Sequence, residues 1–185
     1  CSWGDDAGPL LDFLGVSSER RIRRESILDA GDQGSMSGLV LLDVPDYDSV
    51  TTEHSLQVDR LVPLADILVW VVDPQKYADA ALHDGYLRGL GARQEDMLVL
   101  VNQVDTLPES GLASLLDDVG SLLKDDGLSM VQVLPVSAVR GDNLDVVRSL
   151  LRQRVARESN AARTASAELD AITRRLRPTV AKNKV

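Results

Sequence analysis

Cysteine and aromatic side chains are scarce in this chain, and each scarcity excludes a class of protein. Cys1 is the only cysteine, so no disulfide can form within the chain, and one thiol with two histidines makes no recognisable zinc pattern. Aromatic residues make up 3% of the 185 residues. The core must therefore be built from aliphatic side chains, which favours a parallel α/β sheet. Because no disulfide can form within the chain, the reducing cytoplasm is the location we expect.

Long apolar runs and an excess of positive charge are also missing. The longest apolar run, residues 67–72, is too short to span a bilayer, and the first residues do not resemble a signal peptide. With 20 Lys and Arg against 29 Asp and Glu, the net charge is -9, so we expect no direct binding to DNA. The C-terminal end carries a basic cluster, which we interpret as a solvated tail: Arg174, Arg175, Arg177, Lys182 and Lys184.

Four apolar runs each end on a polar residue, which is the pattern of buried parallel strands. They are residues 39–42 before Asp43, 67–72 before Asp73, 97–101 before Asn102 and 131–136 before Ser137. Stretches of helical length lie at residues 55–64, 78–90, 111–124 and 143–157. This alternation predicts a mainly parallel α/β sheet flanked by helices in one domain, residues 1–157. Residues 158–185 should form a helical, basic tail whose helix ends at Pro178.

The polar residues after these runs indicate where a ligand would bind. In an open parallel sheet, ligands bind beyond the carboxyl ends of the strands, and Asp43, Asn102 and Ser137 all fall there. Any one of them alone could simply cap the helix that follows, because Asp, Asn and Ser are favoured capping residues. Their order along the chain and their neighbours make a shared site the stronger interpretation.

Three short motifs at these positions resemble those of the Ras-like GTPase superfamily, which has the P-loop NTPase fold. Asn102-Gln103-Val104-Asp105 resembles its guanine-specificity motif Asn-Lys-x-Asp, and Ser137-Ala138 resembles its final Ser-Ala loop. Asp43-Val44-Pro45-Asp46 resembles the Asp-x-x-Gly motif before the second switch. The resemblance covers residues 39–157 and is greatest to bacterial Era-like and dynamin-like GTPases. Some short sequence segments are similar to those of actinobacterial members of that group.

The resemblance implies a role for each matched residue in binding GTP or GDP with Mg²⁺. The Asp105 carboxylate would accept from guanine N1–H and the exocyclic amine, Asn102 would brace the loop, and the Ala138 N–H would meet guanine O6. Ser137 would order the loop rather than touch the base. Asp43 would hold Mg²⁺ through water. Relatives of this kind act in ribosome assembly or at membranes, so the resemblance allows a ribosomal partner or membrane association for the complete protein.

Three positions depart from the family pattern. Gln103 replaces the usual lysine and removes a positive charge, although its stem could still lie along the base or ribose. Asp46 replaces the glycine whose N–H meets the γ-phosphate, and Tyr47 stands where Ras-like enzymes carry the water-positioning glutamine. Hydrolysis would need another group in place of that glutamine, and we assign no catalytic residue.

The sequence contains no Gly-x-x-x-x-Gly-Lys-Ser/Thr phosphate loop. We therefore expect an N-terminally incomplete GTP-binding domain that binds nucleotide weakly and is inactive, although the complete protein would hydrolyse GTP. The alternative is a pseudo-GTPase without nucleotide that acts as a scaffold. A Rossmann-type enzyme is disfavoured because its glycine fingerprint is absent. With a leading strand missing, the apolar edge beside residues 39–42 should promote oligomers.

Overall fold

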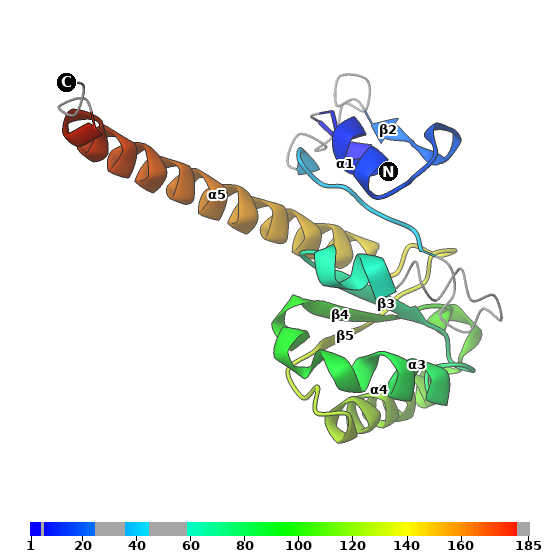
Figure 1. The fold of residues 1–185 in the computed structure, drawn as a ribbon. Coiled ribbons are helices and arrows are strands. Elements are labelled where there is room, and N and C mark those ends of the chain that lie inside the picture. The colour runs from blue at the N-terminus through cyan, green and yellow to red at the C-terminus, as the bar shows by residue number, and fades with distance from the viewer. Residues whose placement is uncertain (5, 25–35, 45–58, 181–185) are drawn as a thin grey trace. The chain divides into compact units, whose positions relative to one another are not determined.

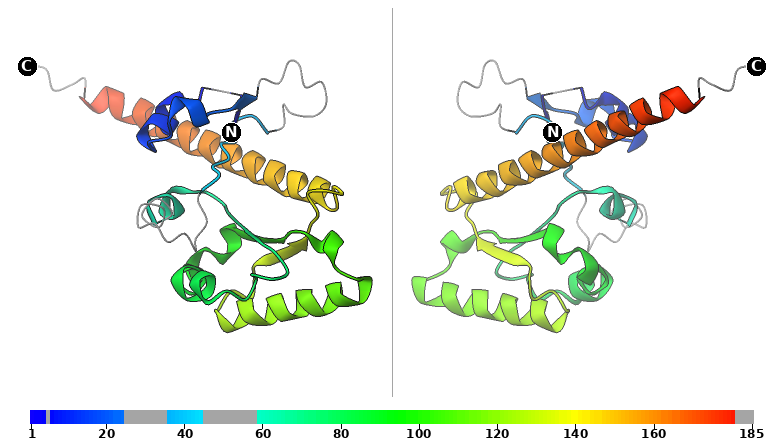
Figure 2. Two further views of the ribbon diagram at one scale, coloured as in Figure 1. Left: turned by 90° about the vertical axis from the view of Figure 1, so that its right-hand side faces the viewer. Right: turned by 90° about the vertical axis from the view of Figure 1, so that its left-hand side faces the viewer.

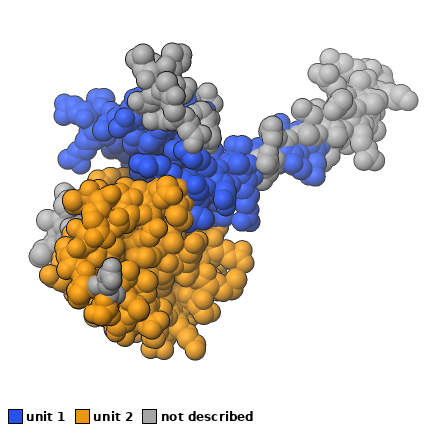
Figure 3. All heavy atoms as spheres, turned by 180° about the vertical axis from the view of Figure 1, so that it is seen from behind, with its two compact units in different colours: residues 1–42, 148–185 blue, residues 43–147 orange. Residues whose placement is uncertain are grey.

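The computed structural model describes residues 1–4, 6–24, 36–44 and 59–180. It divides into two compact units, one formed by residues 1–42 with 148–185 and the other by residues 43–147 (Figure 3). The second unit holds three of the four predicted strands. No described helix combines the length and the apolar character needed to cross a membrane.

The second unit is built on a three-stranded parallel sheet in the order β3-β4-β5. Its strands are β3 (Leu68–Val72), β4 (Met97–Val101) and β5 (Gln132–Pro135), and Val101 pairs with both Val72 and Pro135. The predicted α/β class, with a mainly parallel sheet flanked by helices, is confirmed. The predicted runs at 67–72, 97–101 and 131–136 contain these three strands; the run at 97–101 matches β4 to the residue, and the other two extend one residue beyond β3 and one residue beyond each end of β5.

The core lies between one face of the sheet and the helices that connect the strands. These are α3 (Ala80–Gly85), the 3-10 segment η4 (Leu87–Asp96) and α4 (Glu109–Asp125), and α3 and α4 cover the same face (Figures 1 and 2). All five residues of β4 are buried. From α4, the apolar side chains at helical spacing are buried or half-buried in this core: Leu112, Leu115, Leu116, Val119 and Leu123. The predicted helix 78–90 is divided between α3 and η4.

Helix α4 ends in a Schellman turn, and this turn fixes the residue that follows the helix. The Gly127 N–H donates to the Lys124 carbonyl (3.0 Å) and the Leu128 N–H donates to the Leu123 carbonyl (2.8 Å). Gly127 has φ +81°, which favours glycine, and Leu128 is buried against the same core as Leu123. Asp126 is thereby held at the helix end with its side chain buried.

Residues 39–42 do not form a strand of this sheet, so that prediction was wrong. Leu39 and Leu41 hydrogen-bond instead to the chain's first residues: Trp3 N–H donates to Leu39 C=O (3.0 Å) and Leu41 N–H to Cys1 C=O (2.7 Å). Val40 forms only an isolated antiparallel bridge with Ser2. An apolar run can indicate extended backbone, but it does not specify the partner, and here the N-terminal residues occupy that hydrogen-bonding edge.

The described N-terminal residues of the first unit form only short elements. Strands β1 (Ser2–Trp3) and β2 (Arg23–Arg24) pair in parallel, and between them lie α1 (Gly8–Phe13) and the 3-10 turn η1 (Ser18–Arg20). Gly4 is required by close packing, because a Cβ there would lie 2.1 Å from the Ser37 Oγ, and its φ is +82°.

The last helix is longer than the sequence predicted. A single helix, α5 (Leu144–Val180), spans both the predicted helix 143–157 and the predicted tail, so the predicted boundary between residues 157 and 158 lies inside it. Pro178 does not end this helix, which continues to Val180. Proline has no N–H to donate, so Pro178 removes a single hydrogen bond close to the end of the helix. This small loss explains why two further residues remain helical.

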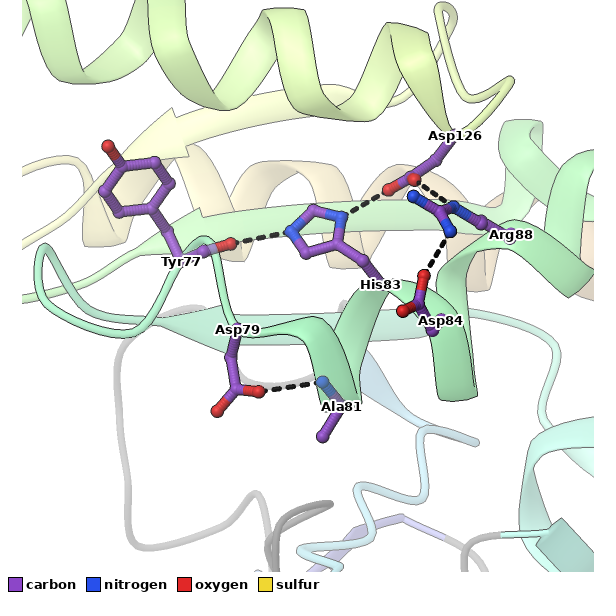
Figure 4. A network of polar contacts seen from close by, with 7 residues as sticks. All are labelled: Tyr77, Asp79, Ala81, His83, Asp84, Arg88 and Asp126. Carbon is purple, nitrogen blue, oxygen red and sulfur yellow. Dashed lines mark hydrogen bonds and ion pairs between the residues drawn. The ribbon is translucent and has the colours of Figure 1, made fainter.

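A polar network with a buried centre at His83 and Asp126 joins α3 to the end of α4 (Figure 4). The Nδ1 of His83 contacts the Asp126 carboxylate, and its Nε2 lies 2.8 Å from the Tyr77 carbonyl. The Arg88 Nε donates to Asp126 at 2.9 Å, and the same guanidinium contacts Asp84. The hydrogen bond to Asp126, followed by the charge of Asp84, raises the pKa of Arg88 further above its usual value. Cationic and N–H partners offset the cost of a carboxylate at the negative end of the helix dipole.

Replacing Asp126 tests the contribution of this network. We expect Asp126→Ala to lower the free energy of unfolding by about 3 kcal/mol, because it leaves a buried imidazole and an arginine without their acceptor. Urea unfolding followed by far-UV circular dichroism measures this. Asp125→Ala is the matched control, since Asp125 is exposed and adjacent. Equal midpoints for the two variants would contradict the assigned role.

Candidate functional site

Two loops meet at the carboxyl ends of β4 and β5, and the sheet itself positions them. The Asn102 N–H donates to the Val72 carbonyl (2.7 Å), and the Val136 N–H donates to the Val101 carbonyl (2.8 Å). The hydrogen bonds of the sheet therefore continue one residue beyond each strand. This places Asn102 and Ser137 side by side where the chain leaves the sheet.

Ser137 joins the two loops through its hydroxyl group. It has 0% exposure, and its Oγ donates to Asp105 Oδ1 at 2.6 Å. The same Oγ accepts the Arg140 N–H at 3.0 Å, so both the donor and the acceptor capacity of this buried hydroxyl are used. The serine thus orders the loop and orients Asp105, which lies on the 3-10 turn η5 (Val104–Thr106).

Asn102 makes a second connection between the loops. Its Oδ1 accepts the backbone N–H of Ala138 at 3.1 Å, across 36 positions of sequence. The N–H that the resemblance assigned to guanine O6 is therefore bonded to Asn102 in this structure. Four of the predicted site residues, Asn102, Asp105, Ser137 and Ala138, lie in one hydrogen-bonded group.

The backbone of these loops is unusual. Gln103 and Asn143 are the two non-glycine residues with positive φ in the described part of the chain, at 63° and 56°. The Gln103 carbonyl accepts from both the N–H and the Oγ of Thr106, at 3.0 and 2.7 Å, which holds the left-handed residue in place. Such backbone conformations gather at functional sites, because the surrounding bonds must offset their cost.

Arg140 and Asn143 support the second loop and were not among the predicted site residues. The Asn143 Nδ2 donates to the Pro135 carbonyl (2.8 Å), while the Arg140 Nε donates to Asp142 (2.8 Å). Gly141, with φ +84°, donates its N–H to the Ser137 carbonyl (2.8 Å) and closes the turn. The glycine and asparagine near the start of α5 are turn residues, and that signal could have identified this support.

The hydrogen-bond pattern allows recognition of a ligand with neighbouring donors. Asp105 is half-buried and its Oδ1 is engaged by Ser137, whereas its Oδ2 accepts no bond among the contacts of the described residues. Ala138 and Gln103 are exposed at the surface beside it. The loops therefore present a fixed carboxylate oxygen next to accessible backbone, which is suited to a flat polar ring.

Of the predicted switch residues, only Asp43 lies within the described part of the chain. Asp43 is exposed, and no hydrogen bond among the described residues joins it to Asn102, Asp105 or Ser137. Pro45, Asp46 and Tyr47 lie outside the described residues. Within the described ranges, no three His, Cys, Asp or Glu side chains gather as metal ligands.

Comparison with known proteins gives a partial likeness to a solved structure. No protein-family model matches the chain, and no curated protein matches it. A crystal structure of Era in complex with MgGDPNP and nucleotides 1506-1542 of 16S ribosomal RNA is similar over 60% of this chain, with 19% sequence identity and a TM-score of 0.45. The match spans 36% of that chain's length.

Removing the Ser137 hydroxyl tests how the loops are held. Ser137→Ala should lower the free energy of unfolding by about 1–2 kcal/mol, because the Arg140 N–H loses its acceptor and Asp105 its donor. Thermal and urea unfolding measure the change, and Ser129→Ala at an exposed position is the control. A loss no greater than that of the control would show that the loops are held by other contacts.

Proposed function

We propose that this chain carries the base-recognition half of a guanine-nucleotide-binding domain, of the Era-like and dynamin-like GTPase group that its motifs resemble. The observation that supports this most is the joining of Asp105 to Ser137 and of Asn102 to Ala138 across two loops at one end of the sheet. These contacts orient a carboxylate beside a backbone N–H, as recognition of a purine edge requires.

Selectivity for guanine follows from the charges and donors of that edge. The Asp105 carboxylate would accept from guanine N1–H and the exocyclic amine, whereas adenine presents an acceptor at N1 and has no amine at that position. Adenine would therefore leave the carboxylate unpaired and facing a lone pair. Contact between the Ala138 N–H and guanine O6 would require that the N–H be shared with, or released from, Asn102 Oδ1.

Mg²⁺ would accompany the nucleotide phosphates. The exposed carboxylate of Asp43 is a hard oxygen donor of the kind that this ion prefers, and it could bind the ion through water. Mg²⁺ would neutralise phosphate charge in the bound nucleotide. Hydrolysis of GTP is proposed for the complete protein only.

A pseudo-GTPase scaffold is the second candidate, and two observations favour it. The Ala138 N–H is already satisfied by Asn102, so the structure has a complete hydrogen-bonding arrangement at this position without a base. The replacement of the usual lysine by Gln103 points in the same direction. A scaffold would show no response of these loops to guanine compounds.

Nuclear magnetic resonance titration with GMP and AMP tests base recognition directly. GMP should bind in the millimolar range and shift the amide signals of Asn102, Asp105 and Ala138, because the base contacts alone supply little free energy. AMP should not shift them. Asp105→Ala should abolish the response, and Asp117→Ala, a matched loss of charge on the exposed face of α4, should preserve it. An unresponsive wild-type chain, or equal responses to GMP and AMP, would reject guanine recognition.

The contribution of the phosphates gives a separate prediction. GTP and GDP should bind this 185-residue chain only weakly, with affinities within about threefold of that for GMP, and the chain should show no measurable hydrolysis. In P-loop sites, backbone N–H groups and a lysine around the phosphates supply most of the binding energy, and this sequence has no such loop. Titration calorimetry and phosphate release measure both quantities. Tight binding of GTP would show that other residues hold the phosphates.

A further inference from the structure

The N–H of Ala138, which the proposed contact with guanine O6 requires, already has an acceptor within the chain. Asn102 Oδ1 accepts it at 3.1 Å, across 36 positions of sequence. Ala138 itself is exposed, so water would satisfy this N–H if the asparagine did not. The bond therefore joins two loops at a position where solvent or a ligand can take the place of the side chain.

Asn102 differs from the other acceptors of the loop that follows β5. Three other N–H groups of this loop donate to acceptors inside the loop, at 2.8–3.3 Å: those of Ser137, Arg140 and Gly141. These bonds close the turn on itself. Ala138 donates instead to a side chain of the loop after β4, so its acceptor can leave without opening the turn.

The side chain of Asn102 can turn away while its backbone stays in place. Its own N–H donates to the Val72 carbonyl at 2.7 Å, which fixes the residue at the end of the sheet. The residue is half-buried and its side chain has two torsions, so the released amide can reach water. Freeing the Ala138 N–H thus requires the rotation of one side chain and no movement of the sheet.

We propose that Asn102 regulates the candidate guanine site as an internal competitor, because its Oδ1 holds the N–H that guanine O6 needs. This inference rests on the guanine recognition proposed above. The amide oxygen of Asn102 and O6 of guanine are both carbonyl-type acceptors, so binding of the base exchanges one hydrogen bond for a similar one. The apparent affinity falls in proportion to the fraction of molecules in which the N–H is free. A hydrogen bond of ordinary net strength makes that reduction about threefold to tenfold.

Hydrogen exchange of the Ala138 amide, followed by nuclear magnetic resonance without added nucleotide, tests the contact itself. In the wild-type chain this amide should exchange at least about threefold more slowly than an unstructured alanine amide, although the residue is exposed. Asn102→Ala should remove this protection, whereas Asn102→Asp keeps an acceptor oxygen and should preserve it. An unprotected amide in the wild-type chain would overturn the proposal without any substitution.

Titration with GMP tests the competition. Asn102→Ala should bind GMP about threefold to tenfold more tightly than the wild-type chain does, because its Ala138 N–H is free to meet O6. Gln132→Ala removes a carboxamide from an exposed position at the other end of β5 and should leave the affinity unchanged. Far-UV circular dichroism verifies that both variants are folded.

A guanine analogue with a weaker acceptor at position 6 separates competition from a general change in the loop. In 6-thio-GMP, sulfur replaces O6 and accepts hydrogen bonds less well. The preference for GMP over 6-thio-GMP should therefore be larger in Asn102→Ala than in the wild-type chain. An equal preference, or GMP binding by the folded variant that is no tighter than wild type, would overturn the competitor role and leave guanine recognition standing. If neither protein responds to GMP, guanine recognition itself is rejected, and the competitor role with it.

Discussion

The second unit depends on one constraint, the complete burial of β4. Its side chains point alternately to the two faces of the sheet, and all five are buried, with Val101 at 0% exposure. A strand in that position must pair its backbone on both sides, because no water reaches it. Parallel neighbours in register satisfy this requirement and also determine where the chain leaves the sheet. The positions of Asn102 and Ser137 follow from the same ladder, since the N–H groups of Asn102 and Val136 are its last members.

The loops beyond the ladder are ordered by side chains that have few alternatives. Ser137 is buried, so its hydroxyl must find partners within the protein, and those within reach are Asp105 and the Arg140 N–H. The left-handed backbone at Gln103 and Asn143 costs free energy that these bonds and the Thr106 contacts offset. The carboxylate of Asp105 is consequently oriented before any ligand binds. Such prior ordering reduces the entropy lost on binding a small rigid ring.

The sequence predicted those features that depend on local pattern and missed those that depend on a distant partner. Residues 97–101 were identified as a strand to the residue, because a short, fully apolar run between polar ends is typical of a strand buried on both faces. Residues 39–42 have the same pattern but pair with residues 1–3, which no periodicity reveals. The contact between His83 and Asp126 spans 43 positions and has no motif. The site loops were identified through motif resemblance, and their recognition of guanine stays a prediction.

The two edges of the sheet differ because of how each strand ends. Pro135 and Asn143 close the β5 edge, and Asn143 belongs to the same turn that holds Ser137, so the candidate site and the protected edge are built from the same residues. Strand β3 is instead followed by Asp73, whose carboxylate accepts the N–H groups of Gln75 and Lys76 at 2.7 and 2.9 Å. That turn satisfies its own polar groups, so the end of β3 needs no support from the loops after β4 and β5.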